Sequence, residues 1–293
     1  MEPMARPEGA PAGAATAPVV EISGVSKVFA PRGQGTRAVE ALVGIDLSVR
    51  AGEFVSLIGP SGCGKSTLLR IVGDLTAPTA GQVLVNEKPA PQARRDRDYG
   101  MVFQAPILFD WRSVQGNVEL PLEINGTPKE ERTRRAAEHL ALVELSDFAG
   151  HYPWQLSGGM QQRVAIARAL ALDPAILLMD EPFGALDEMT RERMNMELLK
   201  IWDRTQTTVL FVTHSIAEAV FLSTRVVVMS ARPGRIASIV DIDLPRERTA
   251  DTRETEAYFR LVTVVREALR GEEGSGTPGA GDTRRVAAEG LSG

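Results

Sequence analysis

The chain has 293 residues, of which 43% are hydrophobic and 24% charged, and its formal net charge is −5. This balance is ordinary for a globular protein with a sizeable core, and the negative net charge argues against a broad electrostatic grip on nucleic acid. The single cysteine, Cys63, has no partner for an internal disulfide, which fits a reducing compartment. No apolar run approaches about 18 residues and the first residues lack the apolar segment of a signal peptide, so we expect no membrane span.

Composition divides the chain into a folded part and two tails. Residues 1–18 and 271–293 are rich in small residues and poor in large apolar ones. We expect both segments to be disordered, because little in them offsets the entropy cost of ordering. The folded part is therefore expected over about residues 19–270.

The first folded stretch is expected to be rich in strands. β-Branched and apolar residues favour strands at 19–29, 38–49 and 81–85. A short apolar run at 54–58 ends in a glycine loop, and a helical pattern follows at 65–72. A strand, a glycine loop and a helix make half of a parallel α/β unit.

The middle of the chain is expected to be helical. Residues 127–130 form a capping box with a proline at the first helical position, which predicts a helix running to about Val143. A second helix is expected from Ser157 to Leu172. After it, the chain returns to an α/β pattern. Strands are predicted at 175–179 and 207–212, helices at 194–202, 216–222 and 254–270, and a hairpin at 225–229 and 235–240.

A phosphate-binding motif follows the strand predicted at 54–58. The residues Gly59-Pro60-Ser61-Gly62-Cys63-Gly64-Lys65-Ser66, followed by Thr67, match the P-loop pattern G-x-x-x-x-G-K-[ST]. Glycines let backbone N–H groups turn toward phosphate oxygens, and the next helix adds its positive N-terminal end. Lys65 is expected to reach the β- and γ-phosphates of ATP and Ser66 to bind Mg²⁺.

The alternative to a nucleotide site is a glycine turn without function. The strand before the motif and the helix after it disfavour this alternative. Cys63 inside the loop is expected to be a spacer, because no second cysteine is present to resolve a redox role.

Two acidic residues follow the apolar run at 175–179. The carboxyl ends of parallel strands open onto the crevice in which ligands bind. Asp180 is expected to hold Mg²⁺, through water, and Glu181 to polarise the attacking water as general base. The alternative is a pair of acids that cap a turn before Pro182.

Two further polar residues are candidates for the same crevice. His214 follows the apolar run at 207–212, as Asp180 follows the run at 175–179, so we expect His214 to contact the γ-phosphate. The alternative is a purely structural histidine. Gln104 follows a short apolar run and is a candidate for contact with the metal or the water, although a surface glutamine would look identical in sequence.

The segment Leu156-Ser157-Gly158-Gly159-Met160-Gln161-Gln162-Arg163 places a serine and two glycines at the start of a helix. This arrangement makes a second anion site. A chain with one phosphate site gains from another only if the second faces a different nucleotide. The sequence therefore predicts a head-to-tail homodimer, in which each ATP lies between the P-loop of one copy and this segment of the other.

This segment resembles the signature motif of ABC ATPases, and the other family elements occur in the family's order over about residues 19–245. The resemblance implies an α/β P-loop NTPase (RecA-like) core with an antiparallel β subdomain and an inserted α-helical subdomain at about 105–172. The positions that match are the P-loop Gly59–Thr67, the Q-loop Gln104, the signature residues Ser157, Gly158 and Gly159, the Walker B pair Asp180 and Glu181, the D-loop Asp187, the H-loop His214 and the adenine-stacking position Phe29.

The resemblance also implies roles for these residues. Glu181 would be the general base, His214 would hold the γ-phosphate, and Gln104 would pass the movement to a membrane partner. ATP would close the dimer and hydrolysis would release it, because the γ-phosphate interacts only with the closed state.

Three classes of protein share these motifs: transporter motors, soluble ABC ATPases of translation or DNA repair, and P-loop binders that no longer hydrolyse ATP. Glu181 and His214 disfavour the last class, because both catalytic positions are filled. A single cassette without sustained heptads disfavours the second. The absence of a membrane run disfavours a fused exporter, but an exporter motor subunit stays an alternative.

Residues 104–118 contain Leu108, Phe109 and Trp111, three large apolar residues in a stretch expected at the surface. They either pack the helical subdomain or line a groove that receives a short helix of the permease. The pattern W-x-x-V-x-x-N-V that begins at Trp111 resembles the ATPases of nitrate, sulfonate and taurine importers, and residues 246–270 resemble their short C-terminal extension.

This subfamily resemblance implies the partners and the location of the protein. It implies a separate integral membrane permease, a solute-binding protein that acts indirectly, and a peripheral position on the cytoplasmic face of the bacterial inner membrane. Cargo specificity resides in the permease and the solute-binding protein, so the transported solute is not readable from this chain.

Overall fold

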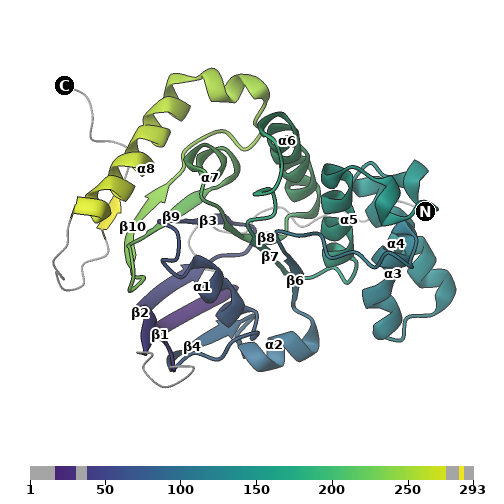
Figure 1. The fold of residues 1–293 in the computed structure, drawn as a ribbon, viewed down its shortest axis with the longest axis horizontal. Helices are drawn as coiled ribbons and strands as arrows, with labels where there is room; N and C mark the ends of the chain where they lie inside the picture. The colour runs from purple at the N-terminus through teal and green to yellow at the C-terminus, as the bar shows by residue number, and fades with distance from the viewer. Residues whose placement is uncertain (1–16, 31–37, 275–283, 287–293) are drawn as a thin grey trace, which may run out of the picture.

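The computed structural model describes residues 17–30, 38–274 and 284–286, and contains two β-sheets and a helical subdomain (Figure 1). The smaller sheet is antiparallel, with the order β2-β1-β4-β5. Its strands are β1 Val20–Phe29, β2 Val39–Val49, β4 Ala80–Val85 and β5 Lys88–Pro89, and the short helix α2 Ala90–Asp96 follows β5. The three longer strands lie within one residue of the predicted ranges.

The larger sheet has the order β11-β10-β9-β3-β8-β7-β6. The strands from β9 to β6 are parallel, whereas β10 is antiparallel to β9 and forms the predicted hairpin with it. All residues of β3, β7, β8 and β9 are buried, as expected for apolar runs covered on both faces. The strands are β3 Phe54–Ile58, β6 Tyr99–Val102, β7 Ile176–Asp180, β8 Thr208–Val212, β9 Arg225–Met229, β10 Ile236–Asp241 and β11 Arg284–Val286.

Helices cover both faces of the larger sheet (Figure 1). Val55 and Leu57 of β3 belong to the core shared with α1 and the smaller sheet, whereas Phe54 and Ile58 belong to the core shared with the helices of the other face. This alternation is the period-two pattern of a strand. The helices are α1 Lys65–Val72 on the first face, and α6 Glu188–Thr205, α7 Ile216–Leu222 and α8 Glu256–Gly274 on the second.

The helical subdomain is inserted between β6 and β7, and lies at the right of Figure 1. Its elements are α3 Val114–Ile124, α4 Lys129–Leu142, η1 Ser146–Phe148, η2 Pro153–Gln155 and α5 Gly158–Leu170. The capping box predicted at 127–130 is wrong. Pro128, not Thr127, occupies the N-cap of α4, and no side chain caps the helix. Thr127 lies one residue before the N-cap, where its N–H donates to the carbonyl oxygen of Leu122.

The C-terminal extension begins with η3 Ala250–Glu254 and continues as α8, which buries Tyr258, Leu261 and Val265. Most of the predicted disordered tails 1–18 and 271–293 lies outside the described residues. Where the structure describes the C-terminal tail, it differs from the expectation: α8 extends to Gly274, and β11 pairs in parallel with β10. Without β11, β10 would be an edge strand of the larger sheet, and a strand edge is a template for pairing with another strand.

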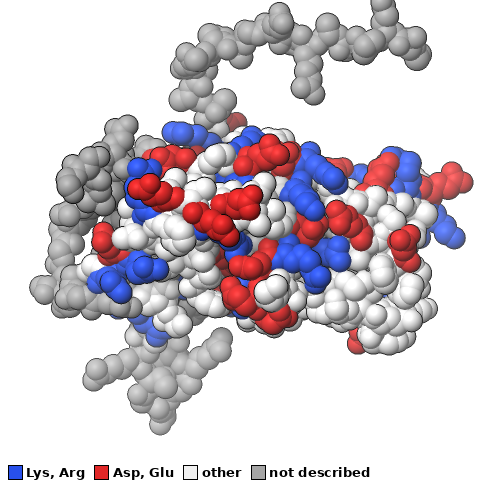
Figure 2. Space-filling model, turned by 90° about the horizontal axis from the view of Figure 1, so that it is seen from above, with Lys and Arg blue, Asp and Glu red and all other residues white. Residues whose placement is uncertain are grey.

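Surface charges of both signs are mixed on the face shown in Figure 2. Charged side chains of different elements form ion pairs, for example Arg253 of η3 with Glu192 of α6 at 2.6 Å. Within residues 17–30, 38–274 and 284–286, no helix is both long and apolar enough to cross a membrane.

Candidate active site

The strand order brings the predicted site residues to one edge of the larger sheet. β8 lies between β3 and β7, and β6 flanks β7, with all four strands parallel. The loops that leave their carboxyl ends carry the glycine motif 59–66, His214, the pair Asp180 and Glu181, and Gln104. This edge of a parallel sheet is where ligands bind in open α/β folds.

The glycine loop has the backbone shape of a phosphate cradle. Gly62 and Gly64 have φ values of 74° and 104°, in the left-handed region that glycine adopts at low cost. A Cβ on Gly64 would also lie 2.6 Å from a methyl carbon of Leu42. Gly64 is the N-cap of α1 and gives the helix no side-chain cap, so the first N–H groups of α1 are available to an anion.

Lys65 lies inside this cradle and is only 5% exposed. Its Nζ donates to the carbonyl oxygens of Gly59 at 2.8 Å and Pro60 at 3.1 Å, and it contacts Cys63 Sγ at 3.7 Å. A thiol is a weak acceptor, so the third of these contacts is the one that a phosphate oxygen would replace. Cys63 is 1% exposed and packs in the core, in agreement with its expected role as a spacer.

Ser66 and Asp180 meet at the start of α1. The Ser66 hydroxyl donates to Asp180 Oδ1 at 2.6 Å, and a guanidinium nitrogen of Arg70 lies 3.6 Å from Asp180 Oδ2. A hydroxyl and a carboxylate this close fit a shared Mg²⁺, which takes one or two carboxylates together with phosphate oxygens and water. Sequence reasoning missed Arg70, although its position four residues after Ser66 puts both on one helix face.

Glu181 and His214 also meet, with 3.5 Å between Oε2 and Nδ1. Glu181 has a φ of 49°, an uncommon value for a residue with a side chain, and its N–H donates to Val212 at the end of β8. Gln104 lies against the turn that follows Glu181, since a Cβ on Gly184 would be 3.2 Å from Gln104 Nε2. The three predicted crevice residues are therefore neighbours.

A buried carboxyl supports the turn that carries His214. The Thr213 hydroxyl donates to Glu218 and accepts the N–H of Ser215 at 3.0 Å. Glu218 is 6% exposed, and desolvation by burial raises the pKa of its carboxyl. Sequence reasoning missed this residue, because a glutamate in the first turn of α7 looks like an ordinary surface charge.

The predicted signature segment packs against the start of α6. Ser157 is the N-cap of α5, and its hydroxyl accepts the N–H of Met160 at 3.3 Å. A Cβ on Gly159 would lie 3.2 Å from Thr190 Cγ2, so the glycine permits close contact.

Two predicted nucleotide contacts have other partners in the structure. Asp187 caps α6 by accepting the N–H of Thr190 at 3.0 Å, and this backbone hydrogen bond lowers the pKa of Asp187. Phe29 ends β1 with 41% exposure, and Lys27 Nζ lies 5.0 Å from the centre of its ring. A role of either residue toward ATP stays a prediction.

The phosphate cradle of the glycine loop, the carboxylates Asp180 and Glu181, and the parallel strands that bring them together define a P-loop NTPase. The family model described as "ABC transporter" matches residues 42–184. An uncharacterized ABC transporter ATP-binding protein of Methanocaldococcus jannaschii is 52% identical over 84% of this chain and 90% of its own length. The nitrate import ATP-binding protein of a Synechocystis species is 44% identical over 87% of this chain and 96% of its own.

Two more comparisons agree with these. The taurine import ATP-binding protein of Rhizobium johnstonii is 47% identical over 80% of this chain and 89% of its own. A dimeric ATP-binding cassette, solved in a post-hydrolysis state with ADP and phosphate, superposes with a TM-score of 0.65 at 37% identity and covers 77% of this chain and 100% of its own. The chain belongs to the ABC transporter family, as an ATP-binding subunit with ATPase activity.

Proposed function

We propose that this chain is the motor subunit of an importer, which hydrolyses ATP at the glycine loop and drives a small solute through a separate permease. Relatives named as nitrate and taurine import ATP-binding proteins, at 44% and 47% identity, support import and this class of solute. The chain would act at the cytoplasmic face of the bacterial inner membrane. The observation that carries the catalytic part is the meeting of Glu181 and His214 beside the Ser66–Asp180 pair.

Binding of ATP would begin at the cradle. The N–H groups of the loop and of the first turn of α1 would surround the phosphates, and Lys65 would exchange its contact with Cys63 for a phosphate oxygen. Ser66 and Asp180, with Gln104 nearby, would hold Mg²⁺. When bound, Mg²⁺ neutralises charge that develops on the phosphate oxygens.

Hydrolysis would depend on the second pair. Glu181 Oε2 would accept a proton from the attacking water. The water oxygen would bond to the γ-phosphorus, the bond between this phosphorus and the bridging oxygen would break, and ADP and phosphate would leave. His214, whose Nδ1 is 3.5 Å from this carboxylate, would hold the γ-phosphate and the water on one line. Preorganised donors at this position stabilise the charge of the transition state.

A second copy of the chain would complete each site. Ser157, Gly158 and Gly159 at the start of α5 would offer a hydroxyl and N–H groups to the nucleotide of the partner. The solved relative described as a dimeric ATP-binding cassette supports this assembly. A head-to-tail pair closes by two-fold symmetry, so both sites are equivalent.

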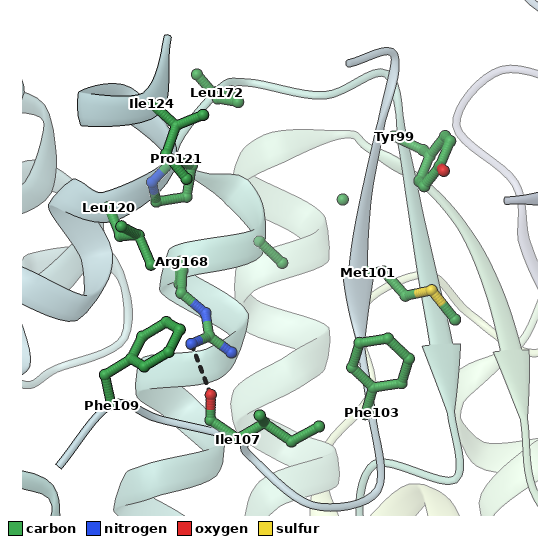
Figure 3. Close-up of a pocket in the computed structure, with 12 residues that line it drawn as sticks. Tyr99, Met101, Phe103, Ile107, Phe109, Leu120, Pro121, Ile124, Arg168 and Leu172 are labelled. Carbon is green, nitrogen blue, oxygen red and sulfur yellow. Dashed lines mark hydrogen bonds between the residues drawn. The ribbon is translucent and has the colours of Figure 1, made fainter. Parts of the chain in front are cut away.

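The permease would dock at a groove beside the segment that follows Gln104. This groove has a volume of about 400 Å³ and is mainly apolar, with Phe103, Ile107, Phe109 and Ile124 among its lining residues (Figure 3). Arg168 fixes one wall by donating to the carbonyl oxygens of Pro106 and Ile107 at 2.9 and 2.8 Å. A short amphipathic helix of the permease fits such a groove.

The three apolar residues predicted in this segment have different environments. Trp111 is 74% exposed and its ring centroid lies 4.9 Å from that of Phe109, so Trp111 does not pack the helical subdomain. Leu108, in contrast, packs against the main core. Asn117 orders the loop that carries Trp111, because its side-chain amide forms hydrogen bonds with the backbone of Phe109, Arg112 and Ser113. Trp111 and Phe109 are thus held at the surface, where a permease helix would reach them.

The substitution Glu181→Gln tests the proposal. It keeps the size of the side chain and removes the base, so we expect nucleotide affinity within about threefold of the unchanged protein and ATP turnover at least about 100-fold slower. We also expect Mg-ATP to convert this variant into a stable dimer, seen by gel filtration with light scattering. Unchanged phosphate release would remove Glu181 from its role.

The transport part needs a separate measurement. The chain would be purified together with a candidate permease, chosen from the genes that neighbour its own. Uptake of nitrate, taurine and alkyl sulfonates into proteoliposomes would be measured with ATP supplied on the side of this subunit. Solute accumulation that requires Glu181 supports import. Outward movement of solute would contradict it.

A further inference from the structure

The hairpin between β9 and β10 touches the outer side of the glycine loop. A Cβ on Gly234 would lie 1.9 Å from the carbonyl oxygen of Cys63, so only glycine permits this contact of two backbones. The same glycine donates its N–H to Ala41 and accepts the N–H of Val43, both at 3.0 Å. The hairpin is therefore fixed to β2 on one side and to the glycine loop on the other.

Arg232 extends from this hairpin to the loop. Its Nε and one terminal nitrogen donate to the carbonyl oxygen of Gly62 at 3.3 and 3.1 Å. The guanidinium is always charged, and hydrogen bonds from a charged donor are about twice as strong as neutral ones. No residue of the catalytic pairs makes this contact, and the P-loop pattern does not include it.

The contact fixes the direction of one N–H group of the cradle. The C=O and N–H of a trans peptide point in opposite directions, so holding the Gly62 carbonyl outward aims the Cys63 N–H inward. In the structure this N–H donates to Pro60 O at 3.3 Å, a long bond across the loop. A phosphate oxygen is a stronger acceptor and would take its place. The cation on the carbonyl also polarises the peptide, which strengthens the N–H as a donor.

We propose that Arg232 is a positioning residue for the nucleotide, which holds the Gly62–Cys63 peptide in its phosphate-binding orientation. The ligand is a nucleoside di- or triphosphate, and this inference rests on the proposed binding of nucleotide at the glycine loop. The contact involves the loop and not the γ-phosphate. Arg232 therefore strengthens binding of ADP and ATP alike and leaves the chemical step unchanged.

The test compares Arg232→Ala with Arg235→Ala. Arg235 is an exposed residue of the same hairpin, and its backbone N–H, not its side chain, bonds Ser230. Both variants lose one positive charge on the same hairpin, so the comparison separates loss of the hydrogen bond from loss of charge. Affinities for fluorescent ADP and ATP analogues, and the steady-state kcat and KM, would be measured at two salt concentrations.

We expect Arg232→Ala to raise the Kd for both nucleotides and the KM for ATP roughly tenfold, with kcat within about twofold. Arg232→Lys keeps the charge but loses the planar fork, so it should recover part of the affinity. Arg235→Ala should change the Kd by less than about twofold. Thermal melting checks that each variant is folded, and Arg232→Gln replaces the alanine variant if that one is not.

Three results would overturn the inference: an unchanged Kd in Arg232→Ala, an equal loss in Arg235→Ala, or a fall in kcat at unchanged KM. Lys65→Ala separates this inference from the proposed function. If Lys65→Ala loses nucleotide affinity and Arg232→Ala does not, the glycine loop remains the site and only the role of Arg232 fails. If Lys65→Ala binds nucleotide normally, the site itself is wrong.

Discussion

At the scale of single residues, the site combines groups that fixed spacing reveals and groups that only the fold reveals. Lys65 and Ser66 were predictable because one loop and one helix must present both to a phosphate. Glu181 and His214 were predictable as the residues that follow two buried parallel strands. Arg232 was not, since it acts on a carbonyl 170 residues away in the chain. No local pattern contains such a contact.

Glu218 gives a prediction at this scale. Burial raises the pKa of its carboxyl above the ordinary value of 4.5. The folded protein then holds a proton that the unfolded chain has released, so the free energy of unfolding falls as the pH rises from about 4.5 through the raised pKa. Glu218→Gln cannot ionise, and its stability should decline less over this range.

Urea unfolding at several pH values between 4.5 and 8 measures this difference. Glu267→Gln, an exposed position of α8, controls for the loss of one surface carboxylate. Parallel pH curves for Glu218→Gln and the unchanged protein would contradict the prediction. Replacing a buried carboxyl with an amide also keeps an acceptor for the Thr213 hydroxyl, so the turn before α7 should stay intact.

At the scale of elements, the long buried strands and helices α1 and α7 were predicted to within one residue, whereas β5, β6, α2 and α3 were not. Continuous apolar runs marked β3, β7 and β8, because both faces of these strands are covered. Helix α3 escaped prediction because Gly116 and Pro121 lower its intrinsic helix propensity. Its buried residues Val114, Val118 and Leu122 recur every four positions, and this packing overrides the propensity.

The connection between β10 and α8 gives a second prediction. Arg248 is buried and donates to the carbonyl oxygens of Pro245, Phe221 and Ser223 at 2.9, 2.6 and 2.9 Å. Burial lowers its pKa to about 10, so it stays charged at neutral pH. Arg248→Met removes these donors, and we expect the free energy of unfolding to fall by about 2–3 kcal/mol.

Urea unfolding at pH 7 measures this loss. The free energy of unfolding of Arg248→Lys should lie between the values of the methionine variant and the unchanged protein. The ammonium group keeps the charge but lacks the planar fork of donors that reaches all three oxygens. Arg266→Met, at an exposed position of α8, is the control. A loss below about 0.5 kcal/mol in Arg248→Met would show that the extension is held by the apolar face of α8 alone.

At the scale of the whole molecule, the α/β core, the antiparallel sheet and the inserted helical subdomain were predictable, because the motifs are typical of one family and its members share this architecture. The sequence did not predict β11, whose pairing with β10 depends on a free sheet edge.

The proposed head-to-tail dimer gives a prediction at this scale. Ser157→Arg blocks the segment that faces the partner, and Lys65→Ala disables the cradle of its own copy. Each variant alone should lack activity. A mixed dimer keeps one intact site, formed by the cradle of the first variant and the signature segment of the second. Mixing the two should therefore restore ATP hydrolysis, up to about a quarter of the original rate if the sites act independently.

Phosphate release from equimolar mixtures measures this rescue, and native mass spectrometry verifies that mixed dimers form. Mixed dimers without any recovered hydrolysis would contradict the shared site. Mixing Ser157→Arg with a second variant of the same segment, Gly159→Arg, is the control, since no combination of these two restores an intact site.

The position of Cys63 has a practical consequence. It is the chain's only thiol, and it is buried beneath the ammonium group of Lys65. An alkylating reagent can reach this sulfur only while the surrounding backbone opens, so the speed of labelling reports on the motion of that one segment. A nucleotide bound at the glycine loop should slow this opening, and the rate of alkylation, read by mass spectrometry, would then report occupancy without an engineered probe.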